Sequence, residues 1–309
     1  MKLFSDLLPQ LQPVLRAAQP WDPDIPQAYP HWPPNPEVLR RELSIPGPDG
    51  PRPAKSYRPA ACAGQVLPAL LWSHGGGYVA GDIDCDDPLC EQFALGAQCC
   101  VFTVDYRLAP AHPYPAGLND SYAALEWIAA HAAELGIDPE RIAVAGASAG
   151  GGMSAALALL ARDRGGPKLC FQMPLYPMLD DRHCTPSSHE ITEQNFPCAW
   201  NRKHSLYAWD CYLRGLRAAH QDVPPYAAPT RAADLHGLPP AFCCIGTLDL
   251  FRDEAIDYAA RLAQADVPVE FHLYPGCFHG FESVYTPTPV GERCRAEYVS
   301  ALRRAFYGE

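Results

Sequence analysis

The sequence has little basic charge, since 24 lysines and arginines stand against 35 aspartates and glutamates, for a formal net charge of −11. Nucleic acids and anionic membranes attract proteins with a basic face, so this balance argues against both partners. The chain also lacks a phosphate-binding loop, a G-x-G-x-x-G motif, an HExxH pair and a CxxC pair. We therefore expect neither a cofactor nor a metal.

Neither a secretory leader nor a membrane span is indicated. Asp6 and Pro9 interrupt the apolar start of the chain, and no small-residue cleavage site follows. The uncharged run 142–161 contains four glycines and changes its pattern halfway, which fits a strand, a turn and a helix better than a span. The 13 cysteines are interpreted as reduced, packed thiols. We expect a cytoplasmic protein without stable membrane insertion, and leave a homodimer open.

Strand and helix patterns alternate along most of the chain. Apolar strands are expected at 66–73, 99–106, 141–147, 168–176, 240–246 and 267–275, with helices between them. An antiparallel hairpin precedes them, after a proline-rich start. Residues 183–220 have no strand period and are expected to be helical, outside the sheet. The pattern predicts one α/β domain over 1–309 with a mostly parallel central sheet and helices on both faces, and residues 183–220 are a candidate lid together with the N-terminal segment.

The strongest chemical signal is G-A-S-A-G at 146–150, a G-x-S-x-G motif between a predicted strand and a predicted helix. A sharp turn at this junction exposes the serine hydroxyl, and the flanking glycines avoid collisions with neighbouring backbone. The helix N-terminus directs free N–H groups and partial positive charge toward the same point. The alternative is a serine that only caps the helix. We assign Ser148 as a nucleophile.

A serine hydroxyl needs a base within hydrogen-bond reach, and that base needs an orienting carboxylate. His279 lies in a loop just past the last predicted strand, where such a base is expected. Asp249, Asp253 and Glu254 follow the strand before it. The start of a helix accounts for carboxylates at the last two positions. Asp249 is therefore the preferred acid, and it completes the chain order Ser, Asp, His.

Three consecutive glycines follow the predicted strand that ends at Ser73. Attack on a carbonyl creates an oxyanion, and backbone N–H groups can approach it only where no side chain intervenes. We assign the N–H groups of Gly76, Gly77 and Ala149 to this oxyanion hole. His74 and Gly75 are assigned to support of the loop, with His74 forming hydrogen bonds rather than transferring protons.

Four aromatic residues are candidates for the wall of a substrate pocket: Tyr78, Phe196, Trp200 and Tyr207. Ordinary packing in the core or in a lid is an equally weighted explanation for them. The segment 105–107 follows a strand beside the expected site, and its expected role is to hold the glycine loop.

These motifs resemble the hormone-sensitive-lipase-like group of α/β-hydrolases, the bacterial carboxylesterases. The shared features include H-G-G-G at 74–77, G-A-S-A-G at 146–150 and F-H-G-F at 278–281, and the resemblance extends from about residue 40 to the end. It implies the α/β-hydrolase fold with a helical cap formed by about 1–42 and 183–222, and hydrolysis of short acyl esters. Ala147 stands where the family often has Asp, and Leu250 where a Pro often follows the acid.

The resulting hypothesis is a serine carboxylesterase that acts on a small-molecule ester through an acyl-enzyme. The same triad could instead cleave an activated amide, such as an aryl formamide, or an acetyl group on a sugar or drug. A non-catalytic ligand receptor on this fold is a different class, as is a pure interaction protein. A receptor is expected to lack a triad residue, whereas Ser148 and His279 are both present.

Overall fold

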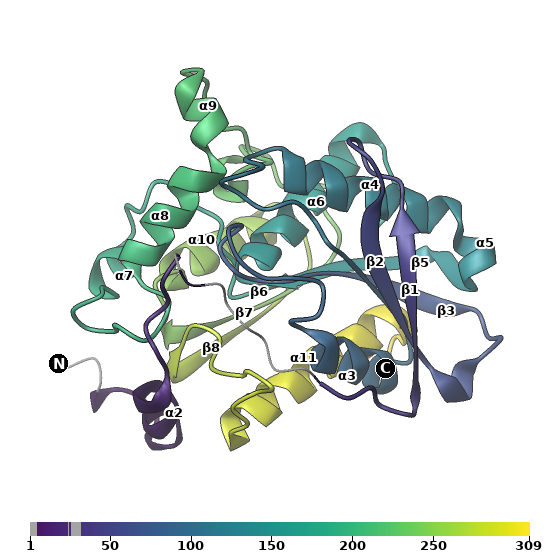
Figure 1. Ribbon diagram of the computed structural model, residues 1–309, viewed down its shortest axis with the longest axis horizontal. Coiled ribbons are helices and arrows are strands. Elements are labelled where there is room, and N and C mark those ends of the chain that lie inside the picture. The colour runs from purple at the N-terminus through teal and green to yellow at the C-terminus, as the bar shows by residue number, and fades with distance from the viewer. Residues whose placement is uncertain (1–4, 24, 26–31) are drawn as a thin grey trace.

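The computed structural model describes residues 5–23, 25 and 32–309 (Figure 1). The strands are β1 (Val38–Ile45), β2 (Arg52–Pro59), β3 (Leu67–Ser73), β4 (Cys100–Val104), β5 (Ile137–Ala147), β6 (Phe171–Leu175), β7 (Ala241–Leu248) and β8 (Val269–Phe278). The helices are α2 (Gln12–Ala17), α3 (Asp87–Ala97), α4 (Ala116–Ala130), α5 (Ala132–Leu135), α6 (Ala149–Arg164), α7 (Pro186–Glu190), α8 (Arg202–Tyr212), α9 (Arg214–Ala218), α10 (Arg252–Gln264) and α11 (Pro289–Tyr307). Short 3-10 turns are η1 (Pro9–Leu11), η2 (Ala60–Cys62) and η3 (Pro229–Arg231).

In the described part of the chain, eight strands form one sheet in the order β1-β2-β4-β3-β5-β6-β7-β8. The pairs from β4 through β8 are parallel, while β1 and β2 form the expected antiparallel hairpin and β2 is antiparallel to β4. Every residue of β3 is buried, which is expected for an apolar strand covered on both faces. The predicted α/β class with a mostly parallel sheet is confirmed.

Helices cover both faces of this sheet. Helices α3 and α11 pack together on one face, and α4 and α6 lie on the other (Figure 1). Capping residues set several boundaries: the Thr288 side chain accepts the Gly291 N–H at the start of α11, and Gly165 ends α6 in the left-handed conformation. The helical region between β4 and β5 is divided, because α4 ends at Ala130 and α5 starts at Ala132. Among the described residues, no helix combines the length and apolar character needed to cross a bilayer.

Helices α7, α8 and α9 lie outside the sheet, as expected for 183–220 (Figure 1). Trp209 and Tyr212 of α8 are buried, and the Tyr212 carbonyl accepts the Tyr114 N–H at 2.8 Å, which joins this segment to the sheet domain. The N-terminal cap boundary near 42 is wrong, because residues from Val38 onward pair with β2 in the sheet. Within the expected cap, positions 1–4, 24 and 26–31 lie outside the described residues.

Candidate active site

The chemically important residues directly follow strand ends. Ser148 follows β5, Asp249 follows β7, and His279 follows β8. Because these strands run parallel, their carboxyl ends meet at one edge of the sheet, where ligands bind in open α/β folds. The fold therefore brings together three residues that are far apart in the sequence.

The turn at Ser148 is strained and crowded. Ser148 has φ 57° and ψ −117°, between the last residue of β5 and the first of α6. A Cβ on Gly146 would lie 2.2 Å from the Gly150 carbonyl oxygen, and one on Gly150 would lie 1.9 Å from that of Ser73. Only glycine fits at these two positions. The Ser148 side chain makes no capping hydrogen bond to α6, so helix capping does not explain this serine.

A continuous hydrogen-bond chain links the three residues. The Ser148 Oγ lies 2.8 Å from His279 Nε2, and His279 Nδ1 lies 2.7 Å from Asp249 Oδ2. Asp249 is fully buried, and its other oxygen accepts the Phe251 N–H at 2.9 Å. An imidazole placed between a hydroxyl and a buried carboxylate can accept the hydroxyl proton while its positive charge is stabilised.

Asp253 and Glu254, the two carboxylates that were not chosen as the acid, have other contacts. Asp253 accepts the Ser187 N–H at 2.7 Å and pairs with Arg252. Glu254 is buried and accepts the backbone N–H groups of Leu179 and Asp180 at 2.7 and 3.1 Å. Burial raises the pKa of Glu254 well above its usual value. Both carboxylates hold the cap-side loops and neither contacts the histidine.

The glycine loop reaches the elbow with its backbone. Gly76 has φ +108°, and a Cβ there would lie 2.1 Å from the Ala80 carbonyl oxygen. A Cβ on Gly75 would lie 3.2 Å from the Ala147 oxygen. In the described part of the chain, the N–H groups of Gly76, Gly77 and Ala149 donate to no acceptor. Unpaired donors beside the nucleophile are suited to receive a developing negative oxygen.

His74 is held in the loop as a neutral group. Its ring stacks on Tyr106 at 4.3 Å, and its Nδ1 lies 2.7 Å from the Gly75 carbonyl oxygen. Tyr106 donates to the His74 carbonyl at 2.8 Å, while the neighbouring Arg107 forms a bidentate pair with buried Asp120. Burial lowers the pKa of His74 to about 4. These contacts agree with the expected supporting role of His74 and of segment 105–107.

A cavity of about 490 Å³ opens at Ser148 and His279. Of the four aromatic candidates, Trp200 lines this cavity. Its ring centroid lies 5.2 Å from that of Trp21, a residue of the N-terminal segment. Gln19 and Trp21 therefore meet the 183–222 region at this cavity. Ala147, which stands where the family often has Asp, forms part of the wall.

The other three aromatic residues do not line this cavity. Tyr78 has φ 64°, which directs its ring away to stack on Tyr212 at 4.0 Å. Phe196 is fully buried in the core. Tyr207 lines a separate cavity beside Trp21 and is 39% exposed. Packing therefore accounts for Tyr78 and Phe196, whereas Tyr207 lies at a neighbouring cavity.

Several wall residues were not found from the sequence. Tyr176, Glu282, Arg295 and Asp86 line the cavity, although no motif marks them. Burial raises the pKa of Glu282, and it raises the pKa of Asp86 to about 6. Among the described residues, no group of three or more His, Cys, Asp or Glu side chains is placed to hold a metal ion.

A nucleophile elbow, an ordered Ser-His-Asp set and a glycine loop at one edge of this sheet define an α/β-hydrolase. A family model described as the alpha/beta hydrolase fold matches residues 70–283, and the chain belongs to this family. It is similar to esterase LipI of Mycobacterium tuberculosis, with 39% identity over 90% of this chain and 86% of the relative. Carboxylesterase NlhH of the same species is 43% identical over 78% of this chain and 75% of its own.

Two of the solved structures that are similar to this chain are esterases as well. A bacterial heroin esterase superposes with a TM-score of 0.88 and 39% identity, covering 98% of this chain and 99% of its own. Esterase LipW of Mycobacterium marinum gives a TM-score of 0.80 and 38% identity, over 87% and 82% of the two chains. The chain is thus assigned to the serine carboxylesterases of the family.

Proposed function

We propose that this carboxylesterase hydrolyses short-chain acyl esters of small molecules, with Ser148 as nucleophile, His279 as base and Asp249 as the orienting acid. The observation that carries the proposal is the unbroken contact from Ser148 Oγ through the imidazole to the buried carboxylate, at 2.8 and 2.7 Å. Ester hydrolysis by this route needs no cofactor.

The acylation step follows from this geometry. Ser148 Oγ attacks the ester carbonyl carbon while His279 Nε2 takes the hydroxyl proton, and the carbonyl π electrons move onto oxygen. The N–H groups of Gly76, Gly77 and Ala149 stabilise that oxyanion. When the tetrahedral intermediate collapses, the bond to the alcohol oxygen breaks, and His279 gives that oxygen its proton. The products are an acyl-serine and the free alcohol.

Deacylation repeats the sequence with water. His279 removes a proton from a water molecule as its oxygen attacks the acyl carbon, and the same N–H groups bind the new oxyanion. Collapse breaks the bond to Ser148 Oγ, which recovers its proton from the histidine. Asp249 keeps the Nδ1 proton directed toward itself in both steps, so Nε2 accepts a proton during each attack and returns it when the intermediate collapses.

The cavity supports a small substrate. Its volume of about 490 Å³ lies within the range of roughly 300–1,000 Å³ for small-molecule sites. Trp21, Trp200 and Tyr176 offer apolar ring surface beside the nucleophile. We propose that residues before Val38 and the 183–222 segment together form the cap over this cavity, on a single domain spanning 1–309.

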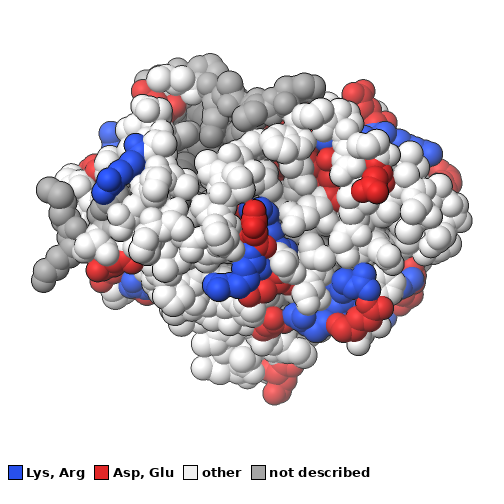
Figure 2. Space-filling view, turned by 90° about the horizontal axis from the view of Figure 1, so that it is seen from below, with Lys and Arg blue, Asp and Glu red and all other residues white. Residues whose placement is uncertain are grey.

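The surface charge and the free cysteines support the expected partners and compartment of the protein. In Figure 2, acidic and basic side chains form small mixed clusters, without a broad basic area among the described residues of that face. With the net charge of −11, this supports the absence of a nucleic-acid partner. All 13 cysteines lie in the described ranges as free thiols, which supports a reducing, cytoplasmic compartment. The homodimer stays a prediction.

The test is a panel of p-nitrophenyl esters from acetate to decanoate, with an aryl formamide as the amide arm. We expect acetate and butanoate to have the highest kcat/KM, and the Ser148→Ala variant to lose turnover of every substrate. A clear preference for the formamide would favour the amidase alternative. Full activity in the Ser148→Ala variant would contradict the nucleophile assignment.

A further inference from the structure

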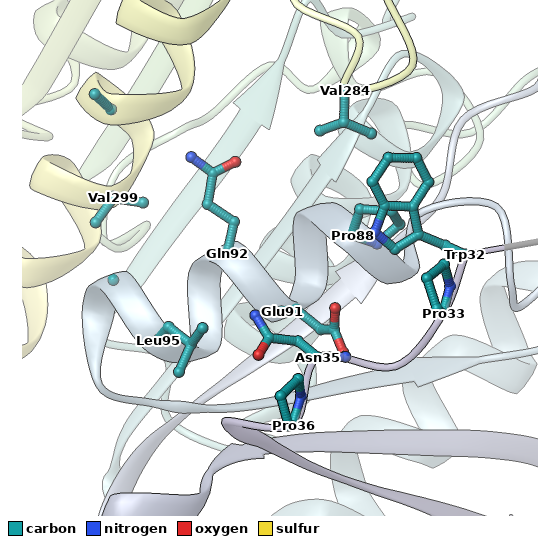
Figure 3. Close-up of a pocket in the computed structure, with 12 residues that line it drawn as sticks. Trp32, Pro33, Asn35, Pro36, Pro88, Glu91, Gln92, Leu95, Val284 and Val299 are labelled. Atoms are coloured by element: carbon teal, nitrogen blue, oxygen red, sulfur yellow. The ribbon is translucent and has the colours of Figure 1, made fainter. Parts of the chain in front are cut away.

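An apolar groove of about 870 Å³ lies between α3 and α11, outside the catalytic cavity. Figure 3 shows Gln92 and Leu95 on α3, Val299 on α11 opposite them, and Val284 with Trp32 at one end. Apolar residues that line it include Trp32, Pro36, Pro88, Leu95, Val284 and Val299. The charge of Glu91 is already compensated, because its carboxylate accepts from Arg40 Nε at 2.7 Å.

Val284 lines both this groove and the catalytic cavity. Residues of the helices α3 and α11 are likewise distributed between the cavity and the groove. On α3, Leu89 faces the catalytic cavity while Pro88 and Gln92 face the groove. On α11, Arg295 faces the cavity while its neighbour Ala296 faces the groove. The two spaces are therefore adjacent, and they share the half-buried residue Val284.

The backbone around Val284 is fixed from both sides. The Tyr285 hydroxyl donates at 2.6 Å to the carbonyl of Cys85, a residue that lies just before the start of α3. Arg295 Nη1 donates to the carbonyl oxygens of Glu282 and Ser283. The segment is therefore anchored on both sides of Val284, the residue that the cavity and the groove share.

We propose that Val284 sets the limit on alkyl-chain length, and that the α3–α11 groove receives the distal methylenes of a longer ester once that barrier is reduced. The proposal rests on the proposed esterase function. Its ligand is an extended alkyl chain, supplied by either half of the ester. Each methylene that becomes buried beyond Val284 is worth about a four-fold gain in kcat/KM.

The experiment compares wild type with Val284→Ala on two series. In p-nitrophenyl butanoate and octanoate the chain is in the acyl half, and in butyl and octyl acetate it is in the alcohol half. We expect the octyl-to-butyl ratio of kcat/KM to rise about ten-fold in one series, since part of the added chain enters the groove. The series that responds identifies which half points toward Val284.

Two further variants make the test specific. Gln92→Phe fills the groove from α3, so adding it to Val284→Ala should cancel the gain while butanoate hydrolysis is kept. Val269→Ala is the matched control, because Val269 is also half-buried but lines a different cavity. It should leave both ratios unchanged. If Val284→Ala fails to fold, Val284→Ser removes the same methyl groups and takes its place.

Unchanged ratios in both series would overturn the proposal, and so would a gain that survives Gln92→Phe, because the chain would then follow another route. Both failures leave short-ester hydrolysis intact. Failure of the esterase function itself would appear differently, as absence of butanoate turnover in wild type.

Discussion

Replacing Asp249 by asparagine tests the triad with almost no change in shape. The carboxylate is fully buried and makes two contacts, one from the Phe251 N–H at 2.9 Å and one with His279 Nδ1 at 2.7 Å. Asparagine can keep the first contact only by aligning its oxygen with Phe251. Its NH₂ group then faces His279, which must accept at Nδ1 and carry its proton on Nε2.

That tautomer cannot take the Ser148 proton. The reversed amide orientation would restore it, but two N–H donors would then meet at Phe251 in a buried site, at a cost of about 1–3 kcal/mol. Loss of the correct tautomer in a serine triad lowers kcat by about 10⁴, equivalent to roughly 5 kcal/mol of barrier. We expect an effect of this order, with the fold retained.

The assay is kcat for p-nitrophenyl butanoate, with the unfolding midpoint measured in parallel. Asp253→Asn is the matched control, because Asp253 contacts Ser187 and Arg252 but not the histidine. A loss of less than ten-fold in Asp249→Asn, or a larger loss in Asp253→Asn, would refute the assignment of the acid.

Three other outcomes are expected. Ser148→Ala should abolish labelling by a fluorophosphonate while keeping the melting temperature within a few degrees; retained labelling would point to another serine. Gly76→Ala should lower kcat by about 10²–10³, because a Cβ would displace the oxyanion loop, whereas Gly50→Ala, with the same φ of +108° but open space around it, should not. His74 has its pKa lowered to about 4 by burial, so between that value and about 6.5 the unfolded chain binds more protons and stability falls as the pH falls. Urea unfolding at pH 7.5 and 4.5 should show wild type losing about 2–3 kcal/mol more than His74→Gln, and equal losses would contradict this.

Much of the framework could be predicted, because each signal was local. Apolar runs gave the strands, and each candidate residue directly followed one of them: Ser148, Asp249, His279 and His74. Parallel strands place their ends at one edge, so position after a strand was enough to bring the residues together. The structure places Asp249, which directly follows β7, against His279, whereas Asp253 lies within α10 and contacts Ser187 and Arg252.

The cavity wall was harder to predict, because it depends on backbone direction and on contacts across the sequence. Tyr78 follows the glycine loop directly, yet its positive φ sends the ring into a stack with Tyr212. Glu282 and Arg295 reach the cavity from a loop and from α11, with no periodicity to mark them. Trp21 belongs to a proline-rich segment whose course no local pattern specifies.

The wide separation of the reacting side chains has a practical consequence for handling the protein. Ser148 and His279 are 131 positions apart, and the histidine belongs to the last tenth of the chain. A product of translation or proteolysis that ends before it would retain most of the sheet strands but lack the proposed base, and we expect it to be inert. Turnover in an extract therefore measures intact molecules, whereas an antibody against the first half would also count the truncated ones.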